Sequence, residues 1–327
     1  KGIRNYDIQL AYEAMRKNAM VPPDGDTKYR FGDRDAWKGY EVRAGLSYYH
    51  SLGYIPSDKT AESVSRTLEY ALDDYCVAQV AKELGHTEDY DRLTGWSKNY
   101  KNLYNKETGF MAARLYNGKW NTDKNDGNWT PSTDLGFTEG SPWTYLFCVM
   151  QDVPGLIDLM GGNEKFAKKL DENFAGNHYD HSNEPGHHYI YLYDFCGQPW
   201  KTQELARKHT KINYRNNPNG INGNDDCGQM SAWYIFSVMG FYPVTPGSGI
   251  YCIGAPQFPK ITMNYNVDGK PQTLEIIANN ISEKNMYVQK LTLDDKLINS
   301  PFLSHKDIIN GYKLIFEMGP EPNRNWK

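Results

Sequence analysis

The sequence lacks three features that would assign its class at once: a paired cysteine motif, a long apolar run and a basic cluster. Its five cysteines are widely spaced and odd in number, which is typical of buried free thiols and indicates neither a disulfide framework nor a structural zinc site. No apolar run approaches the ~20 residues that span a bilayer. A net charge of −4 without a basic run argues against a general nucleic-acid binder.

Aromatic side chains are abundant, with 25 Tyr, 8 Trp and 12 Phe. Such rings stack on the apolar faces of sugars while offering an O–H or N–H group, but they serve ordinary cores equally well. The 327 residues are enough for two domains with large cores. Composition therefore permits a carbohydrate-binding cleft without assigning one.

Apolar periodicity predicts helices through most of the chain before Pro243. The clearest spans residues 60–84, with one apolar face and a glycine that closes it: Val64, Leu68, Leu72, Tyr75, Gln79 and Gly85. Other helices are expected at 7–20, 41–52, 88–103, 163–175 and 200–212, with Thr87 as the N-cap of the third of these. Residues 109–120 resemble a hairpin with a turn at Asn117-Gly118, and the ambiguous YIYLYDF favours a short helix.

After Pro243 the segments become short, alternating and rich in β-branched residues. We therefore expect a mainly α protein with a β C-terminal part, divided into a helical domain at 1–245 and a β-sandwich-like domain at 246–327. Antiparallel helix pairs joined by loops of varied length suggest a toroid or bundle of helical hairpins.

The stretch from 219 to 242 places two adjacent carboxylates, Asp225 and Asp226, just ahead of an apolar helix that Gly240 ends. An Asp in this position is most often an N-cap. One cap needs only one side chain, however, and the flanking glycines Gly220, Gly223 and Gly228 indicate a loop whose backbone approaches something closely. A second, functional role for one carboxylate is therefore left open.

Two other polar loops also carry carboxylates at helix starts. One holds Glu139 just before the Ser141-Pro142 helix start, and the other holds Asn183-Glu184 followed by His187 and His188. In a toroid of hairpins, the loops at one end converge on a pocket. Paired carboxyl groups there suit glycoside hydrolysis, in which one group protonates the leaving oxygen and the other attacks or activates water. Phe137, Trp143 and Tyr145 would desolvate Glu139, whereas a helix N-terminus would lower its pKa, and sequence does not decide between these effects.

The oxygen-rich set of Asn183, Glu184, Asp225 and Asp226 is appropriate to a hard cation such as calcium, with helix capping and surface ion pairs as the alternative. Four histidines follow an H-x2-H and an adjacent-pair spacing: His178, His181, His187 and His188. A zinc site is disfavoured because no HExxH or His–Cys pattern accompanies them. A sugar hydroxyl or a loop hydrogen bond is a better use for these rings.

Five stretches closely resemble the calcium-dependent exo-acting α-mannosidases of glycoside hydrolase family 92: GYIPSDKTAESVSRTLEYALDDYCVAQVAKELG, FTEGSPWTY, NEPGHHYIYLYDFCGQPWKTQ, GINGNDDCGQMSAWYIFSVMGFYPVTPG and FEMGPEPNRNW. The resemblance covers essentially the whole chain. It implies an (α/α)6 toroid with an accessory β-domain. It also implies inverting hydrolysis that releases α-linked mannose from N-glycan or mannan, and we expect an α-1,2-mannosidase. It also implies a bacterial protein, periplasmic or extracellular, and a calcium ion that binds and helps distort the terminal mannose.

The resemblance also implies roles for individual residues. Glu139 would be the general acid, Asp226 the general base, and Asp225 would support or share the base role. Asn183 and Glu184 would belong, with Asp226, to the calcium and sugar subsite. The pocket would be lined by Trp143, His187, His188, Gln198 and Trp200.

The sequence departs from the family in two ways. The usual EGNAWQY is here EGSPWTY, which keeps Glu139 but changes the neighbouring wall and puts the linkage preference in doubt. The family's N-terminal β-sandwich, which contributes to the cleft, is not found ahead of Lys1, and eight or nine predicted helices fall short of the twelve of a toroid. The chain is therefore expected to need that β-sandwich, and the alternative is a catalytically incompetent carbohydrate-binding or structural module.

Overall fold

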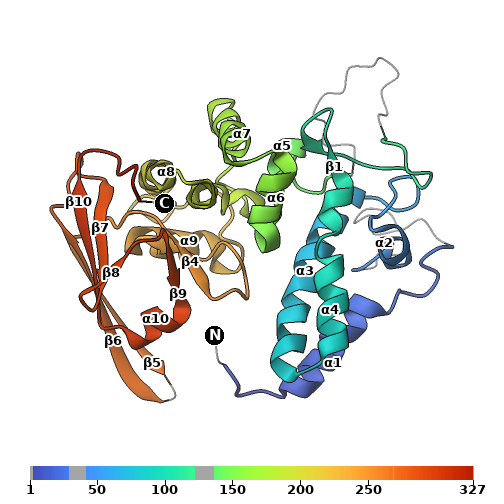
Figure 1. Ribbon diagram of the computed structural model, residues 1–327, viewed down its shortest axis with the longest axis horizontal. Helices are drawn as coiled ribbons and strands as arrows, with labels where there is room; N and C mark the ends of the chain where they lie inside the picture. Colours follow the sequence, from blue (N-terminus) through green and yellow to red (C-terminus); the bar gives the residue numbers. More distant parts are fainter. Residues whose placement is uncertain (1–2, 29–41, 122–135, 268, 327) are drawn as a thin grey trace. The chain divides into compact units, whose positions relative to one another are not determined.

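The computed structural model describes residues 3–28, 42–121, 136–267 and 269–326, and it divides into two compact units, Gly2–Met160 and Gly161–Lys327 (Figure 1). Each unit has its own helices, and the sheets of the C-terminal part belong to the second. Within the described residues, no helix is long and apolar enough to cross a membrane.

The first unit is built around the long helix α3 (Ser63–Leu84), which packs with α1 (Ile8–Met20) and α4 (Thr87–Trp96). Asp7 caps α1 by accepting a 3.0 Å hydrogen bond from the backbone N–H of Leu10. A buried polar contact joins α1 to α4, because the Tyr12 hydroxyl donates to Asp89 at 2.6 Å. Helix α2 (Leu46–Leu52) lies before α3 in the chain.

Helix α3 confirms the predicted helix and its end at Gly85, but the predicted face was partly wrong. Val64 and Leu68 are buried, whereas Leu72, Tyr75 and Gln79 are only half-buried. The fully buried positions in the second half of the helix are Ala71, Asp74, Val77, Ala78 and Ala81. Small alanines lie on this face because α1 and α4 pack closely against it. The prediction ranked positions by side-chain hydrophobicity and therefore favoured the larger residues over these alanines.

The predicted helix over 88–103 is interrupted. Helix α4 ends at Trp96, and a separate 3₁₀ helix, η1, covers Asn99–Leu103. The Ser97 hydroxyl donates to the carbonyl of Thr94 at 2.8 Å, so a side chain competes with the backbone ladder where the helix stops. Thr87 is the first helical residue of α4, so the N-cap is His86 and not Thr87 as predicted.

The rest of the first unit contains short elements. Strands β1 (Tyr104–Asn105) and β2 (Phe110–Met111) pair antiparallel, and an isolated bridge joins Arg114 to Trp120 around the predicted Asn117-Gly118 turn. The unit continues with α5 (Pro142–Tyr145), the 3₁₀ turn η2 (Met150–Asp152) and α6 (Val153–Met160).

The helical half of the second unit contains α7 (Asn163–Ala175), α8 (Pro199–Ile212) and α9 (Gln229–Met239). Between them lie three 3₁₀ segments: η3 (Glu184–Gly186), η4 (Tyr189–Cys196) and η5 (Asp226–Gly228). The YIYLYDF stretch is thus helical, as predicted, although its alternating sequence produced a tight 3₁₀ helix that is buried on nearly all sides.

The C-terminal half of this unit contains two larger sheets. The first has five strands in the order β5-β6-β10-β7-β8, and the second has three in the order β3-β4-β9. Their bounds are β3 (Phe241–Tyr242), β4 (Ile250–Ile253), β5 (Lys260–Val267), β6 (Lys270–Asn279), β7 (Tyr287–Leu293), β8 (Lys296–Ile298), β9 (Phe302–Ser304) and β10 (Lys313–Gly319). Strand β10 runs parallel to β6 and antiparallel to β7, and helix α10 (His305–Asn310) follows β9 directly.

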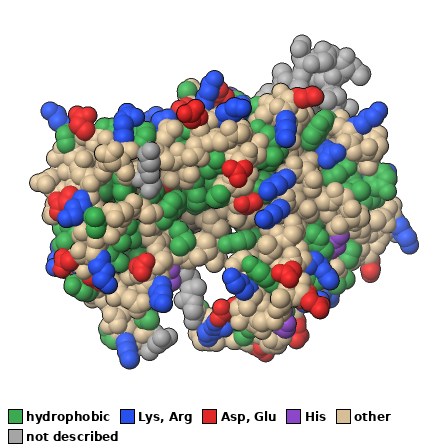
Figure 2. Space-filling view, in the orientation of Figure 1, with side chains coloured by type: hydrophobic (Ala, Val, Ile, Leu, Met, Phe, Trp, Pro, Cys, Tyr) green, Lys and Arg blue, Asp and Glu red, His purple; other side chains and the backbone are tan. Residues whose placement is uncertain are grey.

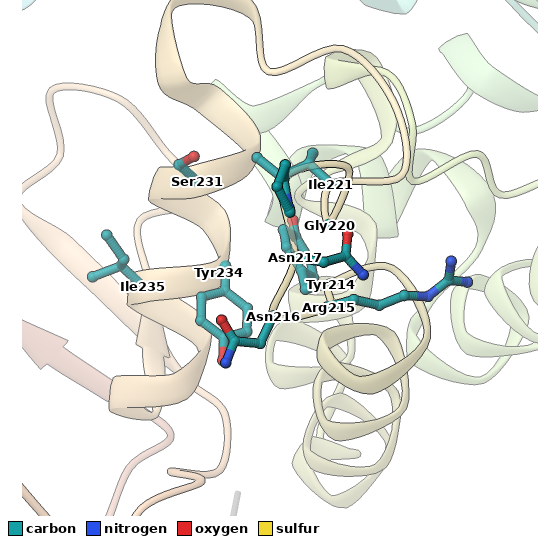
Figure 3. Close-up of a pocket in the computed structure, with 10 residues that line it drawn as sticks. Tyr214, Arg215, Asn216, Asn217, Gly220, Ile221, Ser231, Tyr234 and Ile235 are labelled. Carbon is teal, nitrogen blue, oxygen red and sulfur yellow. The ribbon is translucent and has the colours of Figure 1, made fainter.

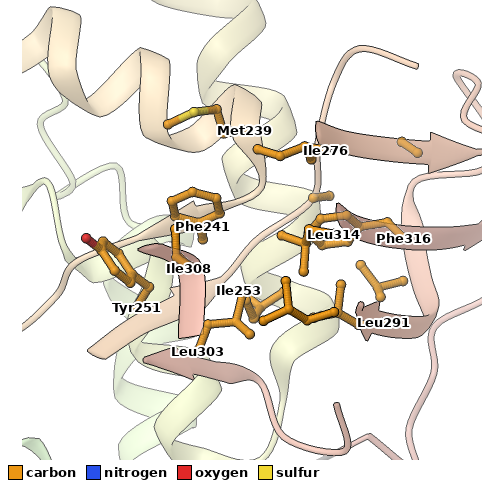
Figure 4. Close-up of a cluster of buried hydrophobic side chains, with 14 of the residues drawn as sticks. Met239, Phe241, Tyr251, Ile253, Ile276, Leu291, Leu303, Ile308, Leu314 and Phe316 are labelled. Atoms are coloured by element: carbon orange, nitrogen blue, oxygen red, sulfur yellow. The ribbon is translucent and has the colours of Figure 1, made fainter. Parts of the chain in front are cut away.

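One hydrophobic cluster joins the two sheets to the end of α9 (Figure 4). Phe316 of β10 is fully buried in it, together with Ile276 of β6 and Phe241 of β3. Gly240 ends α9 with φ +95°, and a Cβ there would lie 2.9 Å from Pro256 and 3.2 Å from the Phe316 ring. Only glycine therefore allows the chain to turn from helix into sheet at this point.

Helices followed by C-terminal sheets confirm the coarse fold class. The end of α9 and the sheets share one hydrophobic core. The predicted division into domains at 1–245 and 246–327 stays a prediction.

Acidic and basic side chains are interspersed over the face in Figure 2, and neither sign forms a broad continuous field there.

Candidate active site

The loop at the start of α9 carries the adjacent carboxylates Asp225 and Asp226. Asp225 is an anchor: one of its oxygens accepts from the Ser231 backbone N–H at 2.9 Å, and the other accepts from the Ser231 hydroxyl at 2.7 Å. These hydrogen bonds, that from the backbone first, lower the pKa of Asp225 and keep it ionised. Asp226 is exposed on η5, so one carboxylate holds the loop while the other faces solvent.

A close backbone contact pins this loop to the one that carries Asn183 and Glu184. Gly223 has φ +142°, and a Cβ there would lie 2.5 Å from the Cα of Ser182. Beside it, the Asn224 N–H donates to the Ser182 carbonyl at 3.2 Å. The close approach predicted from the glycines is therefore confirmed, and it brings the two oxygen-rich loops side by side.

Behind these loops lies a buried chain of hydrogen bonds with one consistent direction. The Tyr214 hydroxyl donates to the Met230 carbonyl at 3.0 Å, so it accepts from Nε2 of His181 at 2.9 Å, which leaves Nδ1 of His181 to accept from Tyr179 at 2.7 Å. Burial lowers the pKa of His181 to about 3, and the charges of His187 and His209 add to this effect. Neutral His181 thus links the 179–182 segment, through Tyr214, to the first turn of α9.

His187 and His188 are both buried, as pocket residues or structural ones would be. Nε2 of His187 hydrogen-bonds the His181 carbonyl at 3.1 Å, its Nδ1 lies 3.4 Å from the Gln229 amide, and its own carbonyl accepts from the Trp233 indole at 2.9 Å. Burial lowers the pKa of His187. These contacts link His187 directly to the first residue of α9, whereas His188 packs edge-on against Tyr189.

Gln198 and Trp200 begin helix α8. Gln198 is its N-cap, and Trp200 is half-buried with the Arg324 guanidinium 4.8 Å from its ring centroid. This cation–π contact gives Trp200 a partner from the C-terminal segment. The role of either residue in the pocket stays a prediction.

A pocket of about 540 Å³ is lined in part by Ser231, the residue to which Asp225 is hydrogen-bonded (Figure 3). Helix α9 contributes Ser231, Tyr234 and Ile235, and the 214–221 loop supplies the other lining residues. Ser231 is shared between this pocket and the hydrogen bonds to Asp225. The pocket combines the rings of Tyr214 and Tyr234 and aliphatic groups with the amides of Asn216 and Asn217, a surface composition that can accept a sugar.

Glu139 lies in the first unit, on an exposed loop that is fastened to the start of α3. The Gly136 carbonyl accepts from the backbone N–H groups of Val64 and Ser65 at 3.0 and 3.1 Å. The Ser65 hydroxyl accepts from the N–H of Thr138 at 2.9 Å. Gly136, with φ +90°, permits this approach, because a Cβ would lie 2.8 Å from the Ser63 hydroxyl.

Helix α5 holds the other side of the Glu139 loop. Ser141 and Thr144 form a capping box, and Pro142 occupies the first helical position as predicted. The buried Tyr145 side chain lies near Ser65 and the backbone of Glu139. Trp143 packs edge-on against Phe110, with ring centroids 4.7 Å apart.

Several residues of these loops were not singled out from the sequence. Ser65, Gln229, Ser231 and Tyr214 all hold a candidate residue or its loop in place. Glu139 and Trp143 belong to the first unit, and the remaining candidates to the second.

Calcium can be tested against the donor chemistry. Asn183, Glu184 and Asp226 offer amide and carboxylate oxygens on two loops that touch, a hard-ligand set that fits calcium. No group of three His, Cys, Asp or Glu side chains converges among the described residues, so an ion here would also need backbone, amide or water oxygens. The paired ring nitrogens of His181 and His187 are already used in hydrogen bonds.

Comparison with known proteins settles the family. The model of the glycosyl hydrolase family 92 catalytic domain matches residues 1–320, nearly the entire chain. The chain belongs to glycosyl hydrolase family 92. It is similar to the family 92 alpha-mannosidase BT3965 from Bacteroides thetaiotaomicron, with 40% identity and a TM-score of 0.86 over 99% of this chain and 41% of that one.

Other family 92 relatives agree. The same enzyme in complex with mannoimidazole matches with 38% identity and a TM-score of 0.86, over 99% of this chain and 42% of that one. The inverting mannosidase BT2199 of the same organism matches with 34% identity and a TM-score of 0.85, over 99% of this chain and 45% of that one.

A protein described as an uncharacterized secreted glycosidase from Arthroderma benhamiae is 32% identical over 97% of this chain and 43% of its own length. The chain thus spans less than half the length of these relatives.

Proposed function

We propose that the protein is a glycoside hydrolase, a calcium-dependent inverting exo-α-mannosidase that releases terminal mannose from N-glycan or mannan. The observation that carries this proposal is the 34–40% identity to alpha-mannosidases over 99% of the chain. An α-1,2-linked mannoside is the substrate class to test first. The fold would be an (α/α)6 toroid completed by an N-terminal β-sandwich, with 246–327 as accessory domain.

Each carboxyl group has a distinct task in this reaction. The Glu139 carboxylic acid donates its proton to the glycosidic oxygen as the bond from that oxygen to C1 of mannose breaks. The Asp226 carboxylate accepts a proton from the water whose oxygen forms the new bond to C1 on the opposite face. The products are β-mannose and the free acceptor hydroxyl, and solvent returns both side chains to their starting protonation states.

The contacts around Asp226 support this assignment. Asp225 is committed to Ser231 through both oxygens, so it orients the loop, while Asp226 keeps a solvent-exposed carboxylate. Asn183 and Glu184, together with Asp226, would hold calcium. When bound, the ion supplies a positive charge that anchors and helps distort the mannose ring. Trp143, His187, His188, Gln198 and Trp200 would shape the pocket around the sugar.

An exported location is part of the proposal, because one relative is described as secreted. The compartment would be extracellular or periplasmic.

The complete protein should release mannose from α-1,2-mannobiose, and proton NMR should detect the β anomer first. The α anomer as first product would rule out inversion. Activity that survives exhaustive chelation would remove calcium from the proposal. Mannose binding without any turnover would instead favour a non-catalytic binding module.

A further inference from the structure

The pocket in Figure 3 is formed by the 214–221 loop and helix α9, and the proposed reaction assigns it no task. Its volume of about 540 Å³ falls within the roughly 300–1,000 Å³ that is typical of small-molecule sites. None of the ten described residues that line it is acidic, and Arg215 is the one charged residue among them. The pocket therefore has room for a small ligand but offers no carboxylate to bind a cation.

The apolar part of the pocket combines a half-buried ring with two exposed aliphatic side chains. The Tyr234 ring projects from α9 toward the 214–221 loop (Figure 3), and its centroid lies 4.8 Å from that of Tyr214. Ile221 and Ile235 are 36% and 54% exposed. A surface of this kind suits the apolar face of a sugar, which can stack on an aromatic ring.

The polar side chains of the pocket have hydrogen-bonding capacity that the protein does not use. The side-chain oxygen of Asn217 accepts from the N–H of Asn219 at 3.0 Å, which leaves its NH2 group available. Among the described residues, none hydrogen-bonds the side-chain amide of Asn216 or the hydroxyl of Tyr234. Amides and hydroxyls can both donate and accept, which matches the hydroxyl groups of a neutral sugar.

Hydrogen bonds within the 214–221 loop fix the shape of this wall. Tyr214 and Ile221 form an antiparallel bridge, and the Arg215 N–H donates to the Gly220 carbonyl at 2.8 Å. A Cβ on residue 220 would lie 1.9 Å from the Arg215 carbonyl oxygen, so only glycine lets the loop close this tightly. A wall that is already ordered lowers the entropic cost of binding a ligand.

Ser231 connects the pocket to the proposed general base. It lines the pocket, and Asp225 accepts from its backbone N–H at 2.9 Å and from its hydroxyl at 2.7 Å. Asp226 is the next residue, with about 3.8 Å between the two Cα atoms. In an exo-acting enzyme the terminal mannose occupies the catalytic subsite, so every other unit of the same glycan lies on the acceptor side. A sugar unit of the substrate that enters this pocket therefore belongs to the acceptor.

We propose that this pocket binds a neutral hexose unit on the acceptor side of a mannose glycan, with its apolar face on Tyr234 and its hydroxyls on Asn216 and Asn217. This inference rests on the proposed function. A neutral unit fits better than an acidic one, because the Arg215 side chain extends away from Tyr234 in Figure 3. The pocket thus makes the enzyme favour longer glycans.

The kinetic test uses the complete protein and two substrates. α-Mannosyl fluoride carries no acceptor sugar, whereas α-1,2-mannotetraose carries three acceptor units. Tyr234→Ala removes a ring and a hydroxyl, so we expect the ratio of kcat/KM for the tetrasaccharide to that for the fluoride to fall about tenfold or more. Tyr234→Phe keeps the ring and should retain more of the ratio.

Asn216→Ala changes an exposed side chain and therefore tests the pocket without a threat to folding. Its ratio should fall by about threefold to tenfold, the size of one neutral hydrogen bond. Tyr312→Ala is the matched control, because Tyr312 is 58% exposed in the same unit and does not line the pocket. Its ratio should equal that of the wild type. Wild-type ratios in both Tyr234→Ala and Asn216→Ala would overturn the proposal.

A binding measurement separates this inference from the proposed function. Calorimetry with S-linked α-1,2-mannotetraose, which resists hydrolysis, should show weaker binding by Tyr234→Ala than by the wild type and by Tyr312→Ala. That result in a protein that hydrolyses no mannoside would refute the function and keep the pocket. Mannoside hydrolysis with equal affinities and equal substrate ratios would refute the pocket and keep the function.

Discussion

Gly223→Ala is the most specific perturbation of the contact between the two oxygen-rich loops. The new Cβ would lie 2.5 Å from the Cα of Ser182, where the obstacle is backbone that no side-chain rotation can move. The residue must also keep φ at +142°, a region that L side chains rarely adopt. Backbone strain of this kind costs about 1–3 kcal/mol.

The same substitution threatens the adjacent hydrogen bond from Asn224 to the Ser182 carbonyl, whose loss costs a further ~1 kcal/mol. Together these effects amount to roughly 2–4 kcal/mol, which the loops can relieve by moving apart. If they do so, kcat/KM should fall by about 30-fold or more, since each 1.4 kcal/mol of lost transition-state stabilisation is tenfold. Apparent calcium affinity should fall with it.

Activity on α-1,2-mannobiose and calcium titration by calorimetry measure these losses. Gly269→Ala is the control, because Gly269 in the β5–β6 hairpin has φ +76° but nothing within 4 Å of the new Cβ. It carries the conformational cost without the clash. If Gly223→Ala matched this control in both activity and calcium affinity, the close contact between the loops would not support the site.

Further predictions concern the anchor, a buried acid and the core. Asp225→Asn should weaken the hold on Ser231, seen as faster amide hydrogen exchange at Ser231 and reduced activity; unchanged exchange would contradict the anchor role. Burial raises the pKa of Asp194 well above its usual value, and the nearby Thr202 hydroxyl and Ile253 N–H do not reach hydrogen-bonding geometry. The folded state therefore holds a proton that the unfolded state releases above about pH 4, so this residue makes stability fall by up to ~1.4 kcal/mol per pH unit as pH rises. Asp194→Asn should remove that slope in urea unfolding between pH 5 and pH 7, and parallel wild-type and variant curves would refute it. Phe316→Ala should cost about 3–5 kcal/mol and lower the Tm by roughly 10 °C, whereas Phe258→Ala, 47% exposed, should change little; equal effects would refute the assignment of the core.

Local signals in the sequence predicted much of the fold. Helix α7 was expected at its observed bounds, Gly85 and Gly240 end their helices, and Pro142 begins α5. The errors came from tertiary effects. The buried face of α3 turned toward small alanines that only close packing distinguishes, and the helix expected over 88–103 breaks where the Ser97 side chain competes with the backbone.

The candidate site was predictable in part. The glycines around Asp225 and Asp226 indicated a close backbone approach, but not that Ser182 would be the partner. The residues that fix the loops come from distant positions, such as Ser65 for Glu139 and Tyr214 for the start of α9. Such pairings depend on long-range packing, for which neither composition nor periodicity carries a signal.

The most direct measurement compares mannose release from α-1,2-mannobiose by the complete wild-type protein with that by Glu139→Gln and Asp226→Asn. General acid–base groups typically contribute 10²–10⁴-fold, so we expect kcat to fall by at least about 100-fold in each variant. Circular dichroism should confirm an unchanged fold. Wild-type activity retained in either variant would contradict the division of labour between these two carboxyl groups.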